Sequence, residues 1–333
     1  MKNINLKFKS YIVNKFGKKF SGKIKIASIK SLNLNEVIIK IQYSSINQKD
    51  YLVCNGLFWD CRNYPLIAGI DGSGIVVKSK SKKFKKGDKV SIVASHAGSK
   101  TPGCFSQYVK IKDYWVSKIP KNLSTKNSMI FGTAGFTAMH IVEKIKKNKN
   151  KIKNILVTGA SGGVGIISIF VLSKLGYNIT AVTRDKKRDA KILLNIGAKT
   201  ILSHKELLDY DTLPLQKILY DICIENVGGN SINYILKRLS NNGTLYSVGF
   251  AKNNSSLNIG LTPFILRRVG IIGIHTESLK NLERIKIWRM ISNFIDQYGL
   301  NNYLFKQIKM SQISNHLKNF NNKKKNGRVL VKL

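Results

Sequence analysis

The stretch that decides the fold runs Asn154-Ile155-Leu156-Val157-Thr158-Gly159-Ala160-Ser161-Gly162-Gly163-Val164-Gly165. An apolar strand enters a glycine turn, the turn opens an apolar helix that reaches Leu175, and a second strand follows from Asn178 to Thr183. In such a unit one glycine permits a sharp turn, another lets backbone N–H groups approach a pyrophosphate, and a third lets the helix pack close to the strand. Because both flanking elements are present, the pattern predicts a dinucleotide site at the helix N-terminus.

The composition is that of a folded chain large enough for two domains, with 333 residues of which 43% are hydrophobic. No run approaches the about 20 apolar residues of a membrane span, and the N-terminus carries no pattern of a secretory signal. The four cysteines, at positions 54, 61, 104 and 223, are scattered thiols, as expected in a reducing compartment. We therefore expect a cytoplasmic protein that does not cross a membrane.

The charge balance is strongly basic, with 57 Lys+Arg against 17 Asp+Glu and a formal net charge of +40. Nucleic-acid binding, attraction of a polyanionic small molecule, and compositional drift toward Lys, Asn and Ile would each produce such a balance. The lysines are spread along the whole chain, whereas binding patches usually cluster. Drift is the favoured interpretation, and we expect at most non-specific contact with nucleic acid.

The pattern changes along the chain. Residues 4–120 contain short strands separated by turn signals, which indicates a β-rich part. After a helical segment from Ser124 to Ile145, strands and helices alternate, as in a parallel sheet covered on both faces. We predict an α/β protein with a Rossmann-type doubly wound domain over residues 122–276. Residues 1–121, completed by 277–333, would form the catalytic domain.

Five segments carry a family resemblance: Ser44–Asp50, Tyr64–Gly74, Gly132–Ala138, Thr158–Gly165 and Pro263–Arg267. Together they resemble the medium-chain dehydrogenase/reductase superfamily, and within it the acrylyl-CoA reductase branch of the zinc-free, quinone-oxidoreductase-like enzymes. The resemblance implies that the β-rich domain is GroES-like. It also implies a homodimer formed through the edge of the cofactor-domain sheet near Gly243–Ala251.

The end of the second strand bears on the choice of cofactor. NAD-dependent enzymes usually place an acid there to bind the ribose 2′-hydroxyl, but this strand ends at Thr183, and Arg184, Lys187 and Arg188 follow. Guanidinium groups suit a 2′-phosphate, so we predict NADPH, with Asp185 pointing outward. The alternative is a charged surface turn. The predicted cofactor-binding residues are Thr133, Thr137, Ser161, Gly162, Gly163, Val164, Gly165, Thr183, Arg184, Arg188, Gly249 and Arg328. For Arg328 a structural salt bridge is an equal alternative.

No metal site is expected. The five histidines, at 96, 140, 204, 275 and 316, share no ligand spacing, and the cysteines form no zinc pattern. Alcohol dehydrogenases carry a zinc-ligand histidine in the segment that resembles Tyr64–Gly74, where this chain has Gly69-Ile70-Asp71.

The reaction that suits such a site is conjugate reduction. Hydride from NADPH would reach the β-carbon of a short α,β-unsaturated thioester such as acrylyl-CoA, and the enolate would then be protonated. The candidate catalytic residues are Asn47, which would hold the nicotinamide ribose or orient the substrate, and Lys49, Asp50 and Tyr51, which would relay a proton. For Asn47 and Asp50 the alternative is helix-cap chemistry. Arg62 and Arg267 are the candidate contacts to the phosphates of an acyl-CoA. The resemblance also implies that Phe58 falls near the place where enoyl-thioester reductases of a related branch carry a catalytic tyrosine. Phenylalanine cannot donate a proton, so solvent or another group must.

Two other functions stay open. One is reduction of quinones or small enones with NADPH. The other belongs to a different class of protein, a relative that keeps the nucleotide fold, has lost turnover, and binds RNA through its positive surface.

Overall fold

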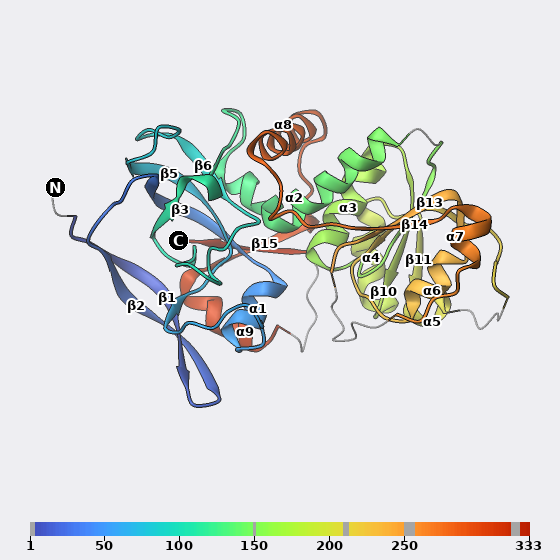
Figure 1. Ribbon diagram of the computed structural model, residues 1–333, viewed down its shortest axis with the longest axis horizontal. Helices are drawn as coiled ribbons and strands as arrows, with labels where there is room; N and C mark the ends of the chain where they lie inside the picture. The colour runs from blue at the N-terminus through green and yellow to red at the C-terminus, as the bar shows by residue number, and fades with distance from the viewer. Residues whose placement is uncertain (1–3, 149–150, 209–212, 250–256, 321–326) are drawn as a thin grey trace.

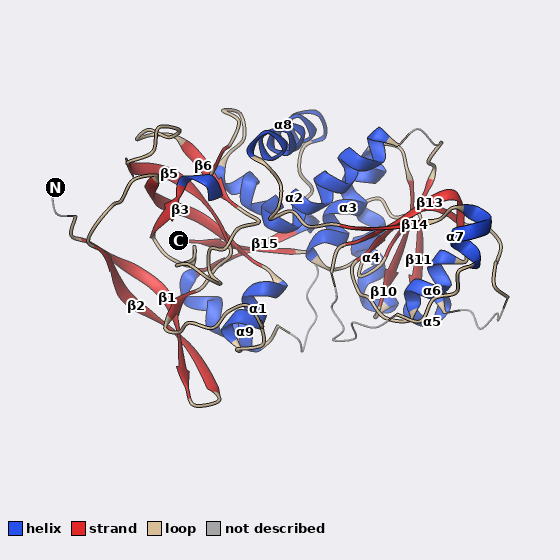
Figure 2. Cartoon of the chain, in the orientation of Figure 1, coloured by secondary structure: helices blue, strands red, loops and turns tan. Residues whose placement is uncertain are grey.

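The computed structural model describes residues 4–148, 151–208, 213–249, 257–320 and 327–333. Figure 1 shows two lobes side by side, with the two chain ends in the same lobe. Figure 2 shows that this lobe is built mainly of strands, whereas helices cover the sheet of the other lobe. Helix α2 (Thr125–Lys147) runs between the lobes and packs on strands of the first and on a helix of the second.

The first lobe contains two sheets. A three-stranded sheet has the order β2-β1-β4, and a seven-stranded sheet has the path β15-β16-β3-β5-β6-β8 with β7 paired to β3. The strands are β1 (Leu6–Phe16), β2 (Lys19–Ile29), β3 (Glu36–Ile46), β4 (Leu66–Ile67), β5 (Asp71–Ser79), β6 (Lys89–Ile92), β7 (Tyr108–Lys112), β8 (Ser117–Lys118), β15 (Phe305–Lys309) and β16 (Arg328–Lys332). Its helices are α1 (Gln48–Cys54), α8 (Asn281–Tyr298) and α9 (Ile313–Lys318), with 3₁₀ turns at Asp113–Trp115, Asn302–Leu304 and Met310–Gln312.

The end of the chain returns to this first lobe. Strand β16 lies antiparallel to β3, with Val329 opposite Ile46, and parallel to β15. This pairing brings β3, from the first part of the sequence, and β16, the last strand, together beside α2. It places Arg328 beside the carboxyl end of β3, where α1 begins.

The second lobe is a six-stranded parallel sheet with the order β11-β10-β9-β12-β13-β14. Its strands are β9 (Asn154–Val157), β10 (Asn178–Thr183), β11 (Thr200–Ser203), β12 (Tyr220–Glu225), β13 (Leu239–Ser247) and β14 (Gly270–Gly273). Its helices are α3 (Gly163–Lys174), α4 (Lys186–Asn195), α5 (His204–Leu207), α6 (Ser231–Leu236) and α7 (Thr262–Arg267). The strand order reverses between β9 and β12, which is where dinucleotides bind in such sheets. The predicted fold class, a Rossmann-type domain with a GroES-like β domain, is confirmed.

Alternation along the strands builds two apolar layers. Ile155 and Val157 of β9 belong to the core that also contains residues of α2, α3 and α8, whereas Leu156 faces the core with α6. Strands buried on both faces have nearly continuous apolar sequences, as β9 does. Strand β13 is paired on both sides, so the prediction that the sheet edge lies near Gly243–Ala251 is wrong for the described part of that segment. The edge strand next to β13 is β14, the other edge being β11, and Phe250 and Ala251 lie outside the described residues.

Candidate active site

The glycine turn lies between β9 and α3, at the carboxyl edge of the parallel sheet. Gly159 has φ +54°, a left-handed conformation that favours glycine, and Gly162 is the N-cap of α3. A Cβ on Gly165 would stand 2.5 Å from the Gly159 carbonyl oxygen and 2.8 Å from the Ala160 Cα. Gly165 therefore allows the helix to pack directly on the turn. The free N–H groups of the first turn of α3 point to where a pyrophosphate would lie.

A buried ion pair lies beside this turn. The Arg328 side chain is 2% exposed, and its Nη2 lies 3.4 Å from Oδ2 of Asp71, which is not exposed at all. Ser45 Oγ donates to Asp71 Oδ2 over 2.6 Å and accepts from Arg328 Nη2 over 2.7 Å. Asn47 Nδ2 donates to Asp71 Oδ2 over 2.8 Å, and Asn47 Oδ1 accepts from Arg328 Nη1 over 2.9 Å. The Thr133 N–H donates to Asp71 over 2.9 Å.

This cluster decides between the two interpretations of Arg328. The Arg328 guanidinium also donates from Nε to the Ile130 carbonyl over 3.1 Å, so each of its nitrogen atoms donates to a group of the protein. Its predicted contact with the cofactor is therefore corrected, because the side chain is enclosed by protein. Burial lowers the pKa of Arg328, and the charges of Asp71 and Asp50 oppose that shift. Nη1 still lies behind the glycine turn, 3.2 Å from where a Cβ of Gly163 would stand.

Gly132 makes room for the ion pair. The backbone of α2 leaves helical geometry there, with φ +52° and ψ −158°. A Cβ at this position would stand 2.5 Å from Asp71 Oδ2 and 2.6 Å from Ser45 Oγ. The kink in α2 and the buried cluster therefore depend on the same residue.

Asn47 and Asp50 have structural roles at the start of α1. The Asp50 carboxylate accepts from the N–H of Asn47 over 2.7 Å and from the N–H of Ile70 over 2.8 Å. Burial raises the pKa of Asp50 to about 7, further raised by the charge of Asp71 and partly offset by these hydrogen bonds. Asp50 has no exposed surface, so the proton relay predicted for it would need a path through other groups. The geometry matches the helix-cap alternative.

Three threonines continue the site from the ion pair toward β14. Thr133 Oγ1 lies 2.5 Å from Asp71 Oδ1, and the Ala94 N–H donates to the same hydroxyl over 2.8 Å. One turn later on α2, Thr137 Oγ1 donates to the Thr133 carbonyl over 2.8 Å and lies 3.4 Å from Thr276 Oγ1. Thr276 lies just after the end of β14, so both lobes contribute to this row of hydroxyls.

A buried carboxylate, Asp189, lies at the end of β10, where the sequence pattern does not predict one. Thr183 Oγ1 donates to Asp189, which is completely buried and accepts from Arg188 Nε over 2.5 Å and from Arg188 Nη2 over 2.9 Å. Burial raises the pKa of Asp189, but hydrogen bonds from Arg188, Thr183 and Ser161 outweigh it, and the net shift is downward. Asp185, predicted to point outward, has a side chain 48% exposed and caps α4 by accepting from the Arg188 N–H. Arg184 is exposed directly after β10.

The remaining predicted residues are dispersed. Lys49 Nζ lies 2.7 Å from Glu277 Oε1, and Tyr51 stacks on Phe320 with ring centroids 5.1 Å apart. Arg62 is exposed. Arg267 is a wrong prediction for a substrate contact, because its guanidinium donates to the carbonyls of Lys237, Leu239 and Gln216. Those carbonyls lie at the amino end of β13, the opposite edge of the sheet. Val164 and Gly249 lie at the carboxyl edge, at the start of α3 and just after β13.

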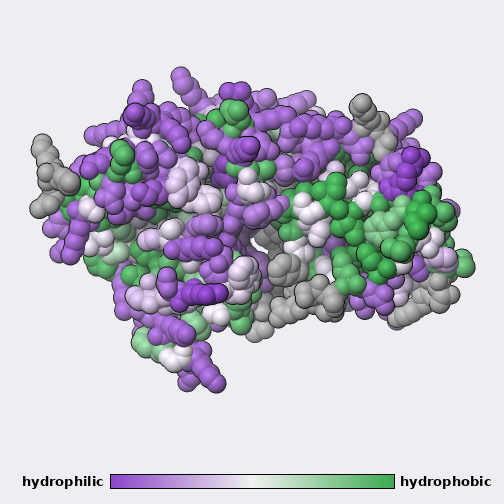
Figure 3. Space-filling model, viewed as in Figure 1, coloured by the Kyte–Doolittle hydropathy of each residue, from purple (hydrophilic) through white to green (hydrophobic). Residues whose placement is uncertain are grey.

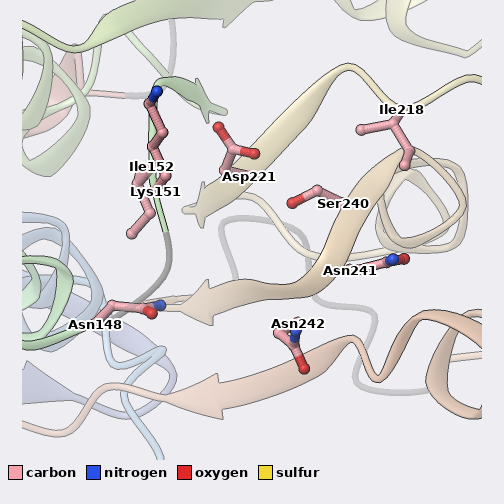
Figure 4. Close-up of a pocket in the computed structure, with 8 residues that line it drawn as sticks. All are labelled: Asn148, Lys151, Ile152, Ile218, Asp221, Ser240, Asn241 and Asn242. Carbon is pink, nitrogen blue, oxygen red and sulfur yellow. The ribbon is translucent and has the colours of Figure 1, made fainter.

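A hollow of about 360 Å³ lies elsewhere, at the amino ends of the strands (Figure 4). It is lined by Asn148, Lys151, Ile152, Ile218, Asp221, Ser240, Asn241 and Asn242. Asp221 in this hollow accepts from the N–H groups of Lys153 and Asn154, both over 2.9 Å, and so closes the entry to β9. Ligands of open parallel sheets bind at the carboxyl edge, so this hollow is not the dinucleotide site.

Two further properties concern metals and membranes. Within the described ranges, no three His, Cys, Asp or Glu side chains gather where they could hold a metal ion. Asp71, in the segment that resembles the zinc-binding one, is instead neutralised by Arg328. None of the helices in the described part of the chain is both long and apolar enough to cross a membrane.

Comparison with known proteins places this geometry in a family. Residues 33–121 match the alcohol dehydrogenase GroES-like domain, and residues 163–293 match the zinc-binding dehydrogenase family. The putative quinone oxidoreductase YhfP of Bacillus subtilis is 32% identical over 93% of this chain and 94% of its own length. Its crystal structure with NAD bound has a TM-score of 0.90 over 98% of this chain and 100% of that one, at 31% identity.

Two other relatives are similar to the chain. Acrylyl-CoA reductase AcuI of Ruegeria pomeroyi is 32% identical over 81% of this chain and 82% of its own length. The yhdH oxidoreductase of Salmonella enterica, solved with NADP, has a TM-score of 0.89 at 29% identity, covering 98% of this chain and 99% of that one. The chain belongs to the medium-chain dehydrogenase/reductase superfamily, a family of oxidoreductases.

Sequence reasoning misses several residues of the site. Asp71 stands out only as the residue near a lost zinc ligand, although a carboxylate inside the apolar run Ile67–Val77 signals a buried partner. Asp189 and Glu277 give no signal of their own, whereas His275-Thr276 is noticeable in the sequence as a departure from the family pattern after the last strand of the cofactor domain. Their roles depend on which strands end at the same edge, and spacing along the chain does not show that.

Proposed function

We propose that this protein is an NADPH-dependent, zinc-independent reductase of the C=C bond of acrylyl-CoA or a similar short α,β-unsaturated thioester, acting in the cytoplasm. The observation that carries the proposal is the glycine turn packed by Gly165, with the hydroxyl row of Thr133, Thr137 and Thr276 leading away from it. The relation to an acrylyl-CoA reductase supports the substrate class. A relative named as a putative quinone oxidoreductase supports the alternative, reduction of quinones or small enones.

The residues present fit a nicotinamide dinucleotide. The first turn of α3 would hold the pyrophosphate through its N–H groups and the positive end of the helix dipole. The nicotinamide end would lie along the threonine row, next to Asn47. When bound, the reduced cofactor supplies a hydride to the β-carbon.

The protein's own contribution is orientation and protonation. Hydrogen bonds to Asp71 and Arg328 fix both ends of the Asn47 amide, so this side chain is a rigid surface against which a bound substrate or cofactor can be oriented. The hydroxyl of Thr276, which can also donate to Thr137 Oγ1, is free to turn and donate a hydrogen bond to the oxygen of a developing enolate. The enolate then needs a proton at its α-carbon, from a group at the mouth of the cleft.

Turnover assays separate the two enzymatic alternatives. Purified protein is incubated with NADPH and acrylyl-CoA, and separately with a quinone, while the nicotinamide absorbance is followed. We expect faster oxidation with acrylyl-CoA. Equal or absent oxidation with acrylyl-CoA counts against the proposal. RNA retention that survives moderate salt with a sharp sequence preference would favour the non-catalytic relative, whereas loss with salt indicates charge alone.

Specificity for NADPH is proposed to come from Arg184 and Arg188. Because Arg188 neutralises the buried Asp189, its removal would both delete a phosphate contact and uncover a negative charge. We expect Arg184→Ala to weaken NADPH binding roughly tenfold and Arg188→Ala by more, with NADH spared. Calorimetric titration of each variant with both cofactors measures this. Lys191→Ala, one turn along α4, is the control, and unchanged NADPH affinity in Arg184→Ala and Arg188→Ala would reject the assignment.

The homodimer is proposed to form through β14. This edge strand exposes Ile271 and Ile272, 36% and 42% of their surface, and α7 beside it exposes Ile265 and Leu266, 69% and 66%. Figure 3 shows a hydrophobic patch on this lobe. An unpaired apolar edge of this kind favours pairing with a second copy. We expect the protein to sediment as a dimer and Ile272→Lys to sediment as a monomer. A monomeric wild-type protein would contradict the proposal.

A further inference from the structure

Three titratable side chains from separate segments meet beside the cleft. Lys49 lies in the first turn of α1, His96 in the loop after β6, and Glu277 just after Thr276. Lys49 Nζ lies 2.7 Å from Glu277 Oε1, and His96 Nε2 lies 3.8 Å from Glu277 Oε2. One carboxylate therefore joins an ammonium and an imidazole, with a different oxygen facing each.

The cluster adjoins the region where a reaction would occur. Glu277 follows Thr276, whose hydroxyl lies 3.4 Å from that of Thr137. Lys49 stands two residues after Asn47, which the buried ion pair holds in place. Figure 3 shows the molecule hollowed between the two lobes, with hydrophilic side chains on the side of the first lobe.

Exposure increases from one member to the next. The exposed fraction of the side chain is 20% at Lys49, 26% at Glu277 and 35% at His96. Lys49 is thus the least exposed member and His96 the member most exposed to solvent. Lys49 and Glu277 are hydrogen-bonded, and the 3.8 Å between Glu277 and His96 can be bridged by a water, so groups ordered in this way can carry protons inward.

We propose that His96, Glu277 and Lys49 form a proton-delivery chain in which Lys49 protonates the α-carbon of the substrate. The assignment rests on the proposed function. An N–H bond of Lys49 breaks as the electron pair of the enolate forms the new C–H bond. Glu277 then returns a proton to the amine, taking it from His96 or water. Each turnover consumes one hydride from the reduced nicotinamide and one proton from solvent.

Neighbouring side chains hold His96, Glu277 and Lys49 in this arrangement. Lys49 Nζ lies 4.9 Å from the centre of the Phe58 ring, in a cation–π contact. The His96 ring packs on Trp115 with centroids 4.6 Å apart. Two other charged side chains lie close enough to interact electrostatically with these three residues. They are Asp60, which is ion-paired with Lys100 over 2.8 Å, and the buried Arg284.

The test compares the rates of Lys49 variants with NADPH and acrylyl-CoA. We expect Lys49→Met to lower kcat about 100-fold or more without changing the KM for NADPH, as for loss of a general acid. Lys49→Arg keeps the ion pair with Glu277 but hardly releases its proton, so we expect the same loss. If the pair only holds the lobes together, Lys49→Arg restores the rate, and the assignment is overturned.

Glu277 and His96 are positioning residues, and their test is a pH profile. Loss of a carboxylate beside an ammonium favours loss of the proton, so we expect Glu277→Gln to lower kcat about tenfold and to move the basic limb of its profile to lower pH. We expect His96→Asn to lower kcat and raise the solvent isotope effect. Lys100→Met, which breaks the nearby ion pair with Asp60, should behave as wild type.

Failure of the two claims can be told apart. If wild-type protein does not oxidise NADPH with acrylyl-CoA, the proposed function falls and this assignment falls with it. If wild type turns over while Glu277→Gln keeps its rate and profile, only the proton-delivery chain is wrong. Urea unfolding midpoints of all variants identify any that lose activity by losing the fold.

Discussion

Replacement of Asp71 by alanine is expected to lower the free energy of unfolding by about 3–5 kcal/mol, the usual cost of leaving a buried charge without its partner. Arg328 is 2% exposed, so its guanidinium would keep its charge with no carboxylate and almost no water. The hydrogen bonds from Ser45, Asn47 and Thr133 would lose their shared acceptor as well. Urea unfolding followed by circular dichroism measures the change.

The double variant Asp71→Asn with Arg328→Met separates the charge from the packing. Because it removes both charges and keeps similar volumes, we expect it to recover much of the stability lost in Asp71→Ala. Glu206→Gln, at an exposed pair with Lys186, is the control and should leave the midpoint near that of wild type. A loss of less than about 1 kcal/mol in Asp71→Ala would mean that the ion pair does not organise the site.

Replacement of Gly165 by valine is expected to abolish cofactor binding, with at least a roughly 100-fold loss of affinity, because the helix N-terminus that binds the phosphates is displaced. The new Cβ would stand 2.5 Å from the Gly159 carbonyl oxygen and 2.9 Å from that of Ala160. Both are backbone atoms, so α3 must move away from the turn, and its N–H groups then no longer point at the phosphates. Overpacking of this kind also costs about 1–3 kcal/mol of stability.

Fluorescence titration with NADPH measures the loss, and Gly260→Ala provides the control. Gly260 lies in a loop of the same lobe, where an added Cβ would meet no atom within 4 Å, so alanine there should leave affinity and stability unchanged. Binding by Gly165→Val at wild-type affinity would show that the pyrophosphate does not lie on this turn.

The local elements of the cofactor lobe can be predicted from the sequence. The strand expected at Asn178–Thr183 is β10 and has those bounds, because turn residues flank a β-branched run. The helix after the glycine turn begins at Gly163, earlier than the apolar run suggests, since Gly162 already serves as its N-cap. Both predictions depend on neighbours in sequence, which is why they succeed.

The buried ion pair cannot be predicted in this way, because its two charges are 257 residues apart in the chain. They meet only when β16 pairs with β3, and the kink of α2 at Gly132 leaves room for them. Sequence patterns therefore assign a single residue such as Arg328 to a ligand when its partner is another part of the protein. The same holds for Arg267, whose carbonyl partners come from the opposite edge of the sheet.

The region after β10, where the adenosine end of the cofactor is expected, shows an intermediate case. Asp189 lies only six residues after Thr183, yet the sequence pattern does not place it in the site. Helix α4 begins at Lys186, and its first turn directs the Asp189 carboxylate back toward the end of β10. The sequence alone favours a helix over Asp189–Ile196, which ends before Gly197 and would begin three residues later than α4 does. Small errors in helix bounds therefore change which side chains form a site.

The proposed activity depends on a main-chain cradle around Gly162 and Gly165 that holds a pyridine dinucleotide. Calorimetric titration of the purified protein with NADPH and with NADH tests this most directly. We expect one site per chain, with NADPH bound more tightly than NADH. No detectable heat with either nucleotide at millimolar concentration would contradict the proposed activity and leave only the architecture.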